Sequence, residues 1–213
     1  MRSTLLATAL LCGLAATARA EERFPTLTPE QMTPEQQRLA AAIAGGARAA
    51  VPGRTPGLGG PFNVWLRSPQ TGDRLQQLGE QLRFRSSIPA ALNEFAILIV
   101  AREWSSQYEW YAHHRLALAA GLPAAVAADL AQGKRPEGMT DEQRIVYEFC
   151  TELHRDHRVS DATFAAAKAK FGEAGVVDLI AVSGYYVAVS MTLNTAQVGL
   201  PDGVAPPLPE LRR

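Results

Sequence analysis

The chain has 213 residues, 21 basic and 21 acidic side chains, and 47% hydrophobic residues. This length fits one domain with a sizeable core, or one domain plus an extension, and the second organisation is favoured. The lack of a basic excess excludes the long-range attraction that nucleic-acid binding requires, so no nucleic-acid partner is expected.

Residues 1–20 have the pattern of a secretory signal peptide. Arg2 is followed by a mostly apolar stretch over residues 5–16, and the Ala-Arg-Ala sequence ending at Ala20 matches a small-x-small cleavage site. The apolar stretch is too short to span a bilayer, although an N-terminal membrane anchor is the alternative. Cleavage after Ala20 predicts a periplasmic or secreted protein, free of the membrane, with 19 basic and 21 acidic residues.

Removal of this segment leaves Cys150 as the single cysteine. An internal disulfide and a Cys-x-x-Cys redox pair are therefore excluded in the mature chain. Apolar residues surround Cys150 at helical spacing, which predicts a small core residue, while a reactive or cross-linking thiol is the alternative.

Residues 21–59 form a predicted N-terminal arm. Residues 21–33 look extended, and Thr33 and Pro34 then begin a helix that runs to about Ala44. The Pro- and Gly-rich stretch 52–61 predicts a long loop, which the apolar residues after Pro61 should anchor.

The remaining pattern is helical, because no stretch alternates like a convincing strand. The expected helices are 73–83 with an apolar stripe of Leu75, Leu78 and Leu82, then 90–105, 107–120, 124–132, 141–154, 162–171 and 173–195. The length of the last helix, with Gly184 inside, predicts a central helix or one at a subunit interface. The Pro-rich tail 201–213 should be extended, so the fold class is all-α with an arm at each end.

The candidate chemistry lies in the helices 90–105 and 107–120. Glu94 precedes seven residues without a polar side chain, Phe95–Ala101, so its carboxylate should be at least partly desolvated. Glu109 and His113 are spaced i and i+4 and share one helix face. A carboxylate beside histidine raises its basicity and suits acid–base catalysis; a partly buried structural ion pair is the alternative.

Other histidines and a metal site have weaker support. On a helix His114 points about 100° away from His113, so both should not reach the same atom. A metal site built from Glu94, Glu109 and His113 has acceptable ligands but no specific signature. His154 and His157 lie in a charged segment that predicts a solvated helix end. No metal or other cofactor is expected.

Four motifs, in this order, make residues 60–200 resemble the carboxymuconolactone decarboxylase family: Gly60–Leu66, Leu92–Leu98, Gln107–His114 and Ala119–Leu122. The resemblance implies an alkyl hydroperoxidase D-like helical bundle that assembles as a homotrimer or homohexamer. It carries over His113 and Glu94 as catalytic residues, with Glu109 beside them. Candidate substrate-binding residues are Ser106, Tyr108, Trp110 and Tyr185, and Tyr111 and Tyr186 are further candidates for an aromatic pocket.

The same superfamily contains peroxidase-like enzymes with a Cys-x-x-Cys pair between the matching Glu and His. Here Ser106 and Glu109 occupy those two positions, and neither can form a disulfide. The resemblance therefore implies cofactor-independent acid–base catalysis, decarboxylation or isomerisation, on a small carboxylated or lactone compound. A non-catalytic small-molecule-binding protein and a peroxidase acting through Cys150 are the alternatives, the latter disfavoured because the cysteine pair is missing.

Overall fold

The computed structural model describes residues 22–50 and 57–210, and within these ranges the regular elements are all helical. The expected all-α fold is confirmed. The helices are α1 (Pro34–Gly45), α2 (Pro61–Trp65), α3 (Pro69–Phe84), α4 (Ala90–Glu103), α5 (Gln107–Ala119), α6 (Ala124–Ala131), α7 (Asp141–Asp156) and α8 (Asp161–Ala196), with short 3-10 turns at Pro29–Gln31 and Ala47–Ala50. The predicted signal peptide and the first half of the 52–61 loop lie outside the described residues.

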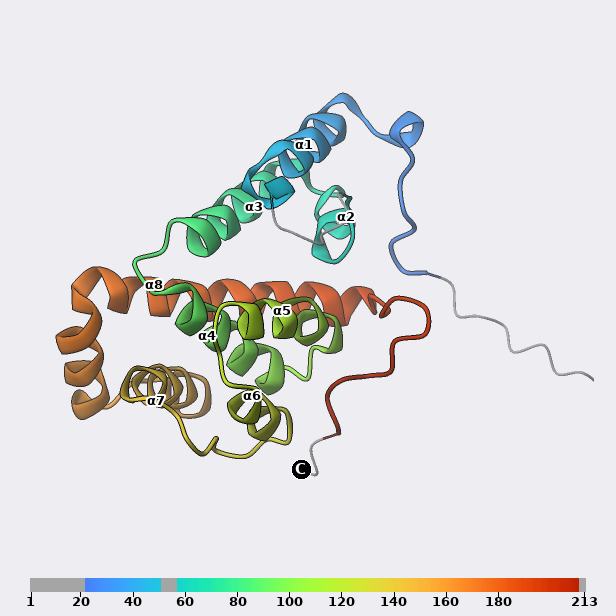
Figure 1. The fold of residues 1–213 in the computed structure, drawn as a ribbon. Helices are drawn as coiled ribbons and strands as arrows, with labels where there is room; N and C mark the ends of the chain where they lie inside the picture. The colour runs from blue at the N-terminus through green and yellow to red at the C-terminus, as the bar shows by residue number, and fades with distance from the viewer. Residues whose placement is uncertain (1–21, 51–56, 211–213) are drawn as a thin grey trace, which may run out of the picture.

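The long C-terminal part of α8 runs through the middle of the molecule, with α1–α3 on one side and α4–α7 on the other (Figure 1). Helix α8 bends at Gly172, whose φ of 69° lies in the left-handed region that glycine adopts readily. The bend separates the two expected helices 162–171 and 173–195. Helix α8 is long and apolar enough to cross a membrane by composition, but half of its most apolar window is buried in the fold, as in a core helix.

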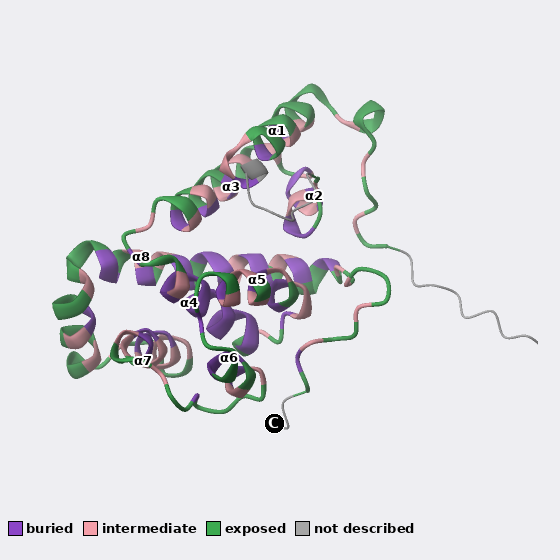
Figure 2. Ribbon diagram, in the orientation of Figure 1, coloured by how far each residue is buried: buried purple, intermediate pink, exposed green. Residues whose placement is uncertain are grey.

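Helix α4 is the centre of the main core. Every residue from Leu92 to Arg102 is buried, which confirms the prediction of a helix covered on all sides. Figure 2 shows buried residues along α4 and along the long part of α8. The side chains packed around it include Trp110, Val146, Phe149, Leu179, Val182 and Tyr186. This rigid helix holds Glu94 at a fixed place inside the fold.

Helices α1, α2 and α3 enclose a second, smaller core of Leu39, Ile43 and Leu66. Gly72 allows this close packing, because a Cβ there would lie 2.7 Å from the Trp65 carbonyl oxygen. Helix α1 follows the expected Thr33 cap, which accepts a hydrogen bond from the Gln36 N–H. The arm helix is thus packed against α3.

Two details of α3 and α2 differ from the predictions. Helix α3 begins at Pro69, four residues before the expected start, since proline is well tolerated in the first turn of a helix. Its expected apolar stripe is incomplete, because Leu82 is buried whereas Leu78 is 42% exposed. Pro61 is the first residue of α2, and the Asn63 N–H donates to the Leu58 carbonyl at 2.9 Å, which joins the described end of the loop to this helix.

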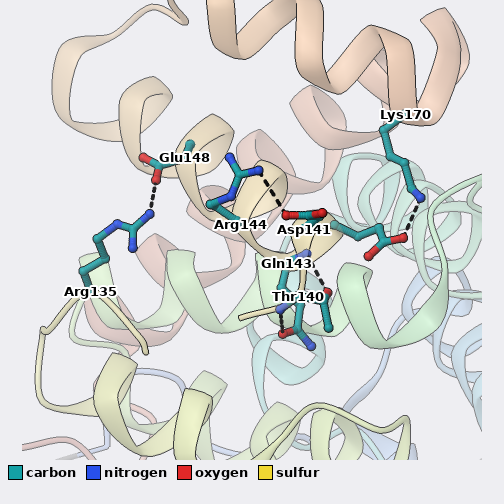
Figure 3. A network of polar contacts seen from close by, with 8 residues as sticks. Arg135, Thr140, Asp141, Gln143, Arg144, Glu148 and Lys170 are labelled. Carbon is teal, nitrogen blue, oxygen red and sulfur yellow. Dashed lines mark hydrogen bonds and ion pairs between the residues drawn. The ribbon is translucent and has the colours of Figure 1, made fainter. Parts of the chain in front are cut away.

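Polar contacts fix the start of α7 and join it to its neighbours (Figure 3). Thr140 and Gln143 form a capping box, in which each side chain accepts a hydrogen bond from the other's backbone N–H. The Lys170 ammonium pairs with Glu142 at 2.5 Å and ties α8 to α7. An exposed ion pair of this kind is weak because solvent screens its charges, so the cap contributes more than the pair to where α7 begins.

Both terminal segments are fastened to the helices. The Asn63 side chain donates to the Phe24 carbonyl at 2.8 Å and holds the N-terminal arm along α2. At the other end, the Gln107 side-chain amide both donates to and accepts from the backbone of Leu208, whose side chain is buried. Arg102 adds a hydrogen bond to the Pro209 carbonyl. The described part of the tail, residues 201–210, contains no helix and lies against the helices through these contacts.

Candidate active site

The turn between α4 and α5 brings the candidate acid–base residues together. The Ser106 N–H donates to the Ala101 carbonyl at 2.8 Å, and Ser105 adopts a left-handed φ of 46°, as at a helix C-terminus that reverses the chain. The reversal lays α5 back along α4 (Figure 1). Residues 19 positions apart, Glu94 and His113, consequently meet inside the fold.

His113 lies between two carboxylates. Its Nδ1 is 2.6 Å from Glu94 Oε2, in a hydrogen bond, and its Nε2 is 3.1 Å from Glu109 Oε1. All three residues are buried, at 6%, 8% and 3% exposure in the order His113, Glu94, Glu109. Glu109 Oε1 has the distance of an ion pair but no hydrogen-bond partner in the fold, so it can still accept a hydrogen bond from a ligand.

The two carboxylates make His113 a cation at neutral pH. Burial by itself lowers the pKa of the imidazole, but the negative charges of Glu94 and Glu109 outweigh it and raise the pKa to about 9. With the ring protonated, Nδ1–H donates to Glu94. The other ring nitrogen, Nε2, is not engaged by Glu94 and faces Glu109 Oε1 at 3.1 Å.

Arg83, near the end of α3, places a positive charge beside Glu94. Its Nη2 lies 3.8 Å from Glu94 Oε1. Burial opposes ionisation of Glu94, yet the neighbouring His113 and Arg83 charges lower the pKa of its carboxyl below the ordinary value. Two carboxylates thus face two cations, an arrangement that compensates charge in a buried site.

Three residues of this cluster, Arg83, Glu109 and His113, lie on the wall of a cavity of about 470 Å³, whereas Glu94 contacts them without lining it. Glu109 and His113 line it from α5, Arg83 from α3, and Tyr185 and Tyr186 from α8. The His113 and Tyr186 rings meet edge to face, with centroids 5.2 Å apart. Reactive side chains from three helices therefore converge on a space large enough for a small organic molecule.

The cavity wall carries an excess of positive charge. Arg48 and Arg115 line it in addition to Arg83, while Glu109 is the single acidic side chain among the described residues of the lining. Arg48 is 3% exposed, its guanidinium lies over the Phe62 ring at 5.3 Å, and its Nη2 donates to the Gln76 carbonyl. Arginines held in this way are suited to bind carboxylates.

Of the four predicted substrate-binding residues, two line the cavity and two do not. Tyr108 and Tyr185 line the cavity, as do the further candidates Tyr111 and Tyr186. Ser106 and Trp110 are not part of the lining: Ser106 is fully buried in the α4–α5 turn, and Trp110 packs in the core. They have no route to a ligand in this cavity.

The arginines of the site were not found from the sequence. Arg83 reaches Glu94 from a different helix, so no helical spacing links the two residues. A signal for Arg48 does exist: it is the single charged residue in the small-residue segment Gly45–Val51. A long cationic side chain in such a segment indicates a specific partner, here the Gln76 carbonyl and the Phe62 ring.

The other histidines lie outside this site. The His114 ring stacks on Trp110, with centroids 5.8 Å apart. His157 is exposed at the end of α7, whereas His154 is half-buried, so the expected solvated helix end holds for His157 alone. In residues 22–50 and 57–210, no group of three or more His, Cys, Asp or Glu side chains could hold a metal ion.

Cys150 lies in the core, fully buried, as predicted. Burial raises the pKa of its thiol to about 11, against a smaller opposite effect of the Ser183 hydroxyl, which donates to the sulfur. A neutral, enclosed thiol is a poor nucleophile, which argues against peroxidase chemistry through this residue.

No family model, curated protein or solved structure matches the chain.

Proposed function

We propose that this protein is a cofactor-independent acid–base enzyme that decarboxylates or isomerises a small carboxylated or lactone compound. The observation that carries the proposal is the position of His113, which lies between Glu94 and Glu109 on the wall of a cavity of about 470 Å³. Perturbed titratable groups that converge on a cavity favour a catalytic role over a surface ion pair.

The raised pKa of His113 assigns it the role of proton donor. At neutral pH a histidine with a pKa of about 9 is protonated and can deliver a proton to a developing carbanion or enolate. Glu94 holds the ring through Nδ1 and stabilises the cation, so Nε2 is the nitrogen that transfers the proton.

His113 and Glu109 account for the proton transfers in both reactions. In a decarboxylation, the electron pair of the breaking C–C bond moves to the adjacent carbon as carbon dioxide leaves, and His113 Nε2–H protonates that carbon. In an isomerisation, the Glu109 carboxylate removes a proton from one carbon and His113 protonates another. Water then restores the proton on His113 after a decarboxylation, and transfer from Glu109 restores it after an isomerisation.

The arginines of the cavity favour a substrate with a carboxylate. Arg83 and Arg48 present guanidinium groups to the space beside His113, and both are held by contacts within the fold. Guanidinium–carboxylate pairing gives orientation as well as affinity. A neutral substrate would leave this positive wall without a partner.

The resemblance to the carboxymuconolactone decarboxylase family supports the reaction type, and membership of that family is part of the proposal. Export after cleavage at Ala20 and assembly as a homotrimer or homohexamer belong to the same proposal. The non-catalytic alternative requires the same cavity and arginines but assigns no proton transfer to His113.

A panel of β-keto acids and lactone carboxylates tests this function through carbon dioxide release and product analysis. The wild-type protein should turn over at least one class, and His113→Asn should lower kcat by about 100-fold or more. His114→Asn is the matched control, because this neighbouring side chain points away from the cavity. Carboxylate binding without turnover in the wild type would favour the binding protein, and full activity of His113→Asn on a turned-over compound would refute the acid–base role.

A further inference from the structure

A second cavity, of about 780 Å³, lies beside the first. The two share two lining residues, Gly59 and Tyr108. The second cavity is bounded mainly by the N-terminal arm, by α2 and by the end of α8 with the chain just after it, and Tyr108 is the residue that α5 contributes to it. Tyr108 therefore stands at the boundary between the catalytic cavity and a separate space.

The position of the Tyr108 ring is built into the fold. On one side it packs edge to face against Tyr111, with centroids 6.3 Å apart. On the other side it lies against Gly59 and Gly60: a Cβ at Gly60 would be 2.9 Å from a ring carbon, and one at Gly59 would be 3.3 Å from the hydroxyl. Gly60 also has a φ of 67°, so glycine serves both the backbone turn and the contact with the ring.

The linings of the two cavities differ in chemistry. The catalytic cavity carries three arginines, His113 and Glu109. The second cavity has the apolar residues Leu58, Val64, Ala196 and Val198, and its two charged residues, Glu22 and Arg23, are exposed. The amide of Asn63 in this lining is already bonded to the N-terminal arm. A neutral, mostly apolar extension of a ligand would fit this space, whereas a second carboxylate would find no buried cation.

We infer that Tyr108 is a specificity-determining residue that limits ligand length. This inference rests on the proposed function, since it assumes that a carboxylate binds beside His113 and Arg83. With the tyrosine ring in place, the catalytic cavity accepts a compact carboxylate. Removal of the ring joins the two cavities, so that a carboxylate with an apolar extension can pass the boundary and bury that extension against Val64 and Val198.

Binding of benzoate and para-phenylbenzoate, measured by calorimetry, tests the inference. Wild-type protein should prefer benzoate, whereas Tyr108→Ala should shift the ratio of the two Kd values by about tenfold or more toward the longer compound, since burying the extra ring contributes more than about 1.4 kcal/mol. Tyr108→Phe keeps the ring and should retain the wild-type ratio. Leu116→Ala is the matched control: it enlarges the catalytic cavity from the same helix at a residue that does not line the second cavity, so the ratio should shift less.

The neutral pair benzyl alcohol and para-phenylbenzyl alcohol separates failure of this inference from failure of the proposed function. If the carboxylates bind but Tyr108→Ala leaves their ratio unchanged, Tyr108 does not limit length and the proposed function is unaffected. If the carboxylates do not bind while the longer alcohol binds more tightly to Tyr108→Ala than to the wild type, Tyr108 does form the boundary, and the proposed carboxylate-binding site is refuted. If neither longer compound gains affinity in a Tyr108→Ala protein whose circular dichroism spectrum and unfolding curve are unchanged, the inference is refuted.

Discussion

Replacing His113 by Gln should remove a defined pH dependence from the free energy of unfolding. The folded protein raises the pKa of this imidazole from 6.5 to about 9. Each pH unit of difference between the folded and unfolded pKa corresponds to about 1.36 kcal/mol. Protonation of His113 should therefore stabilise the fold by about 3 kcal/mol wherever the residue is protonated in both states.

The sign follows from the direction of the pKa change. A raised folded pKa means that the folded state binds the proton more tightly, so the stabilisation is complete below about pH 6.5 and is lost as the pH rises through about 9. The lowered pKa of Glu94 changes the free energy of unfolding only below its ordinary value of 4.5. The raised pKa of Tyr186 changes it only above its ordinary value of 10. Neither of these groups titrates in the window of His113.

Urea unfolding followed by far-UV circular dichroism measures the effect. Between about pH 6 and about pH 9.5 the wild-type free energy of unfolding should fall by about 3 kcal/mol relative to that of His113→Gln. His114→Gln should retain the large fall, because the His114 ring contacts Trp110 rather than the two carboxylates and burial lowers its pKa instead of raising it. Parallel wild-type and His113→Gln curves over this range would refute the assignment of a protonated His113.

Three further predictions concern single residues. Glu94→Gln should lower the pKa of His113 by about one to three pH units, read from the imidazole resonances by NMR; an unchanged pKa would contradict the ion pair. Cys150 should react with a disulfide reagent about 100-fold or more slowly in the native protein than in urea, and rapid native labelling would contradict its burial. Gly72→Ala should lower the free energy of unfolding by about 1–3 kcal/mol, because its Cβ would clash with neighbouring atoms. Gly45→Ala is the control, since no atom lies within 4 Å of its Cβ, and equal effects of the two substitutions in denaturant unfolding would contradict this packing.

The parts of the fold that were predictable from the sequence are those fixed by local pattern. Phe95–Ala101 contains no polar side chain, so burial of α4 on all sides followed directly. Thr33 and Thr140 marked helix starts that the structure confirms, since capping depends on a few consecutive residues. The start of α3 at Pro69 was missed because Thr71 and Gly72 resemble a turn, and only the packing of Gly72 against Trp65 shows why glycine lies within this helix.

The site was predictable to the extent that it depends on one helix. Glu109 and His113 were expected to meet because they lie one turn apart, and they do so at 3.1 Å. Arg83 could not be placed, because its contact with Glu94 joins two helices, α3 and α4, that each pack against α8. Arg48 depends on the packing of the N-terminal segment against Gln76 and is equally beyond helical spacing.

The position of Trp110 shows where stricter use of helical geometry would have improved the prediction. At about 100° per residue, the cavity-lining residues of α5 from Tyr108 to Leu116 spread over one face whose centre is Ala112. Trp110 lies about 160° from that centre and His114 about the same angle on the other side, so the two rings turn to the opposite face and stack there. Glu109 and His113 fall at one edge of the cavity face, toward α4, and this edge position is what lets His113 contact the buried Glu94 while it borders the ligand space.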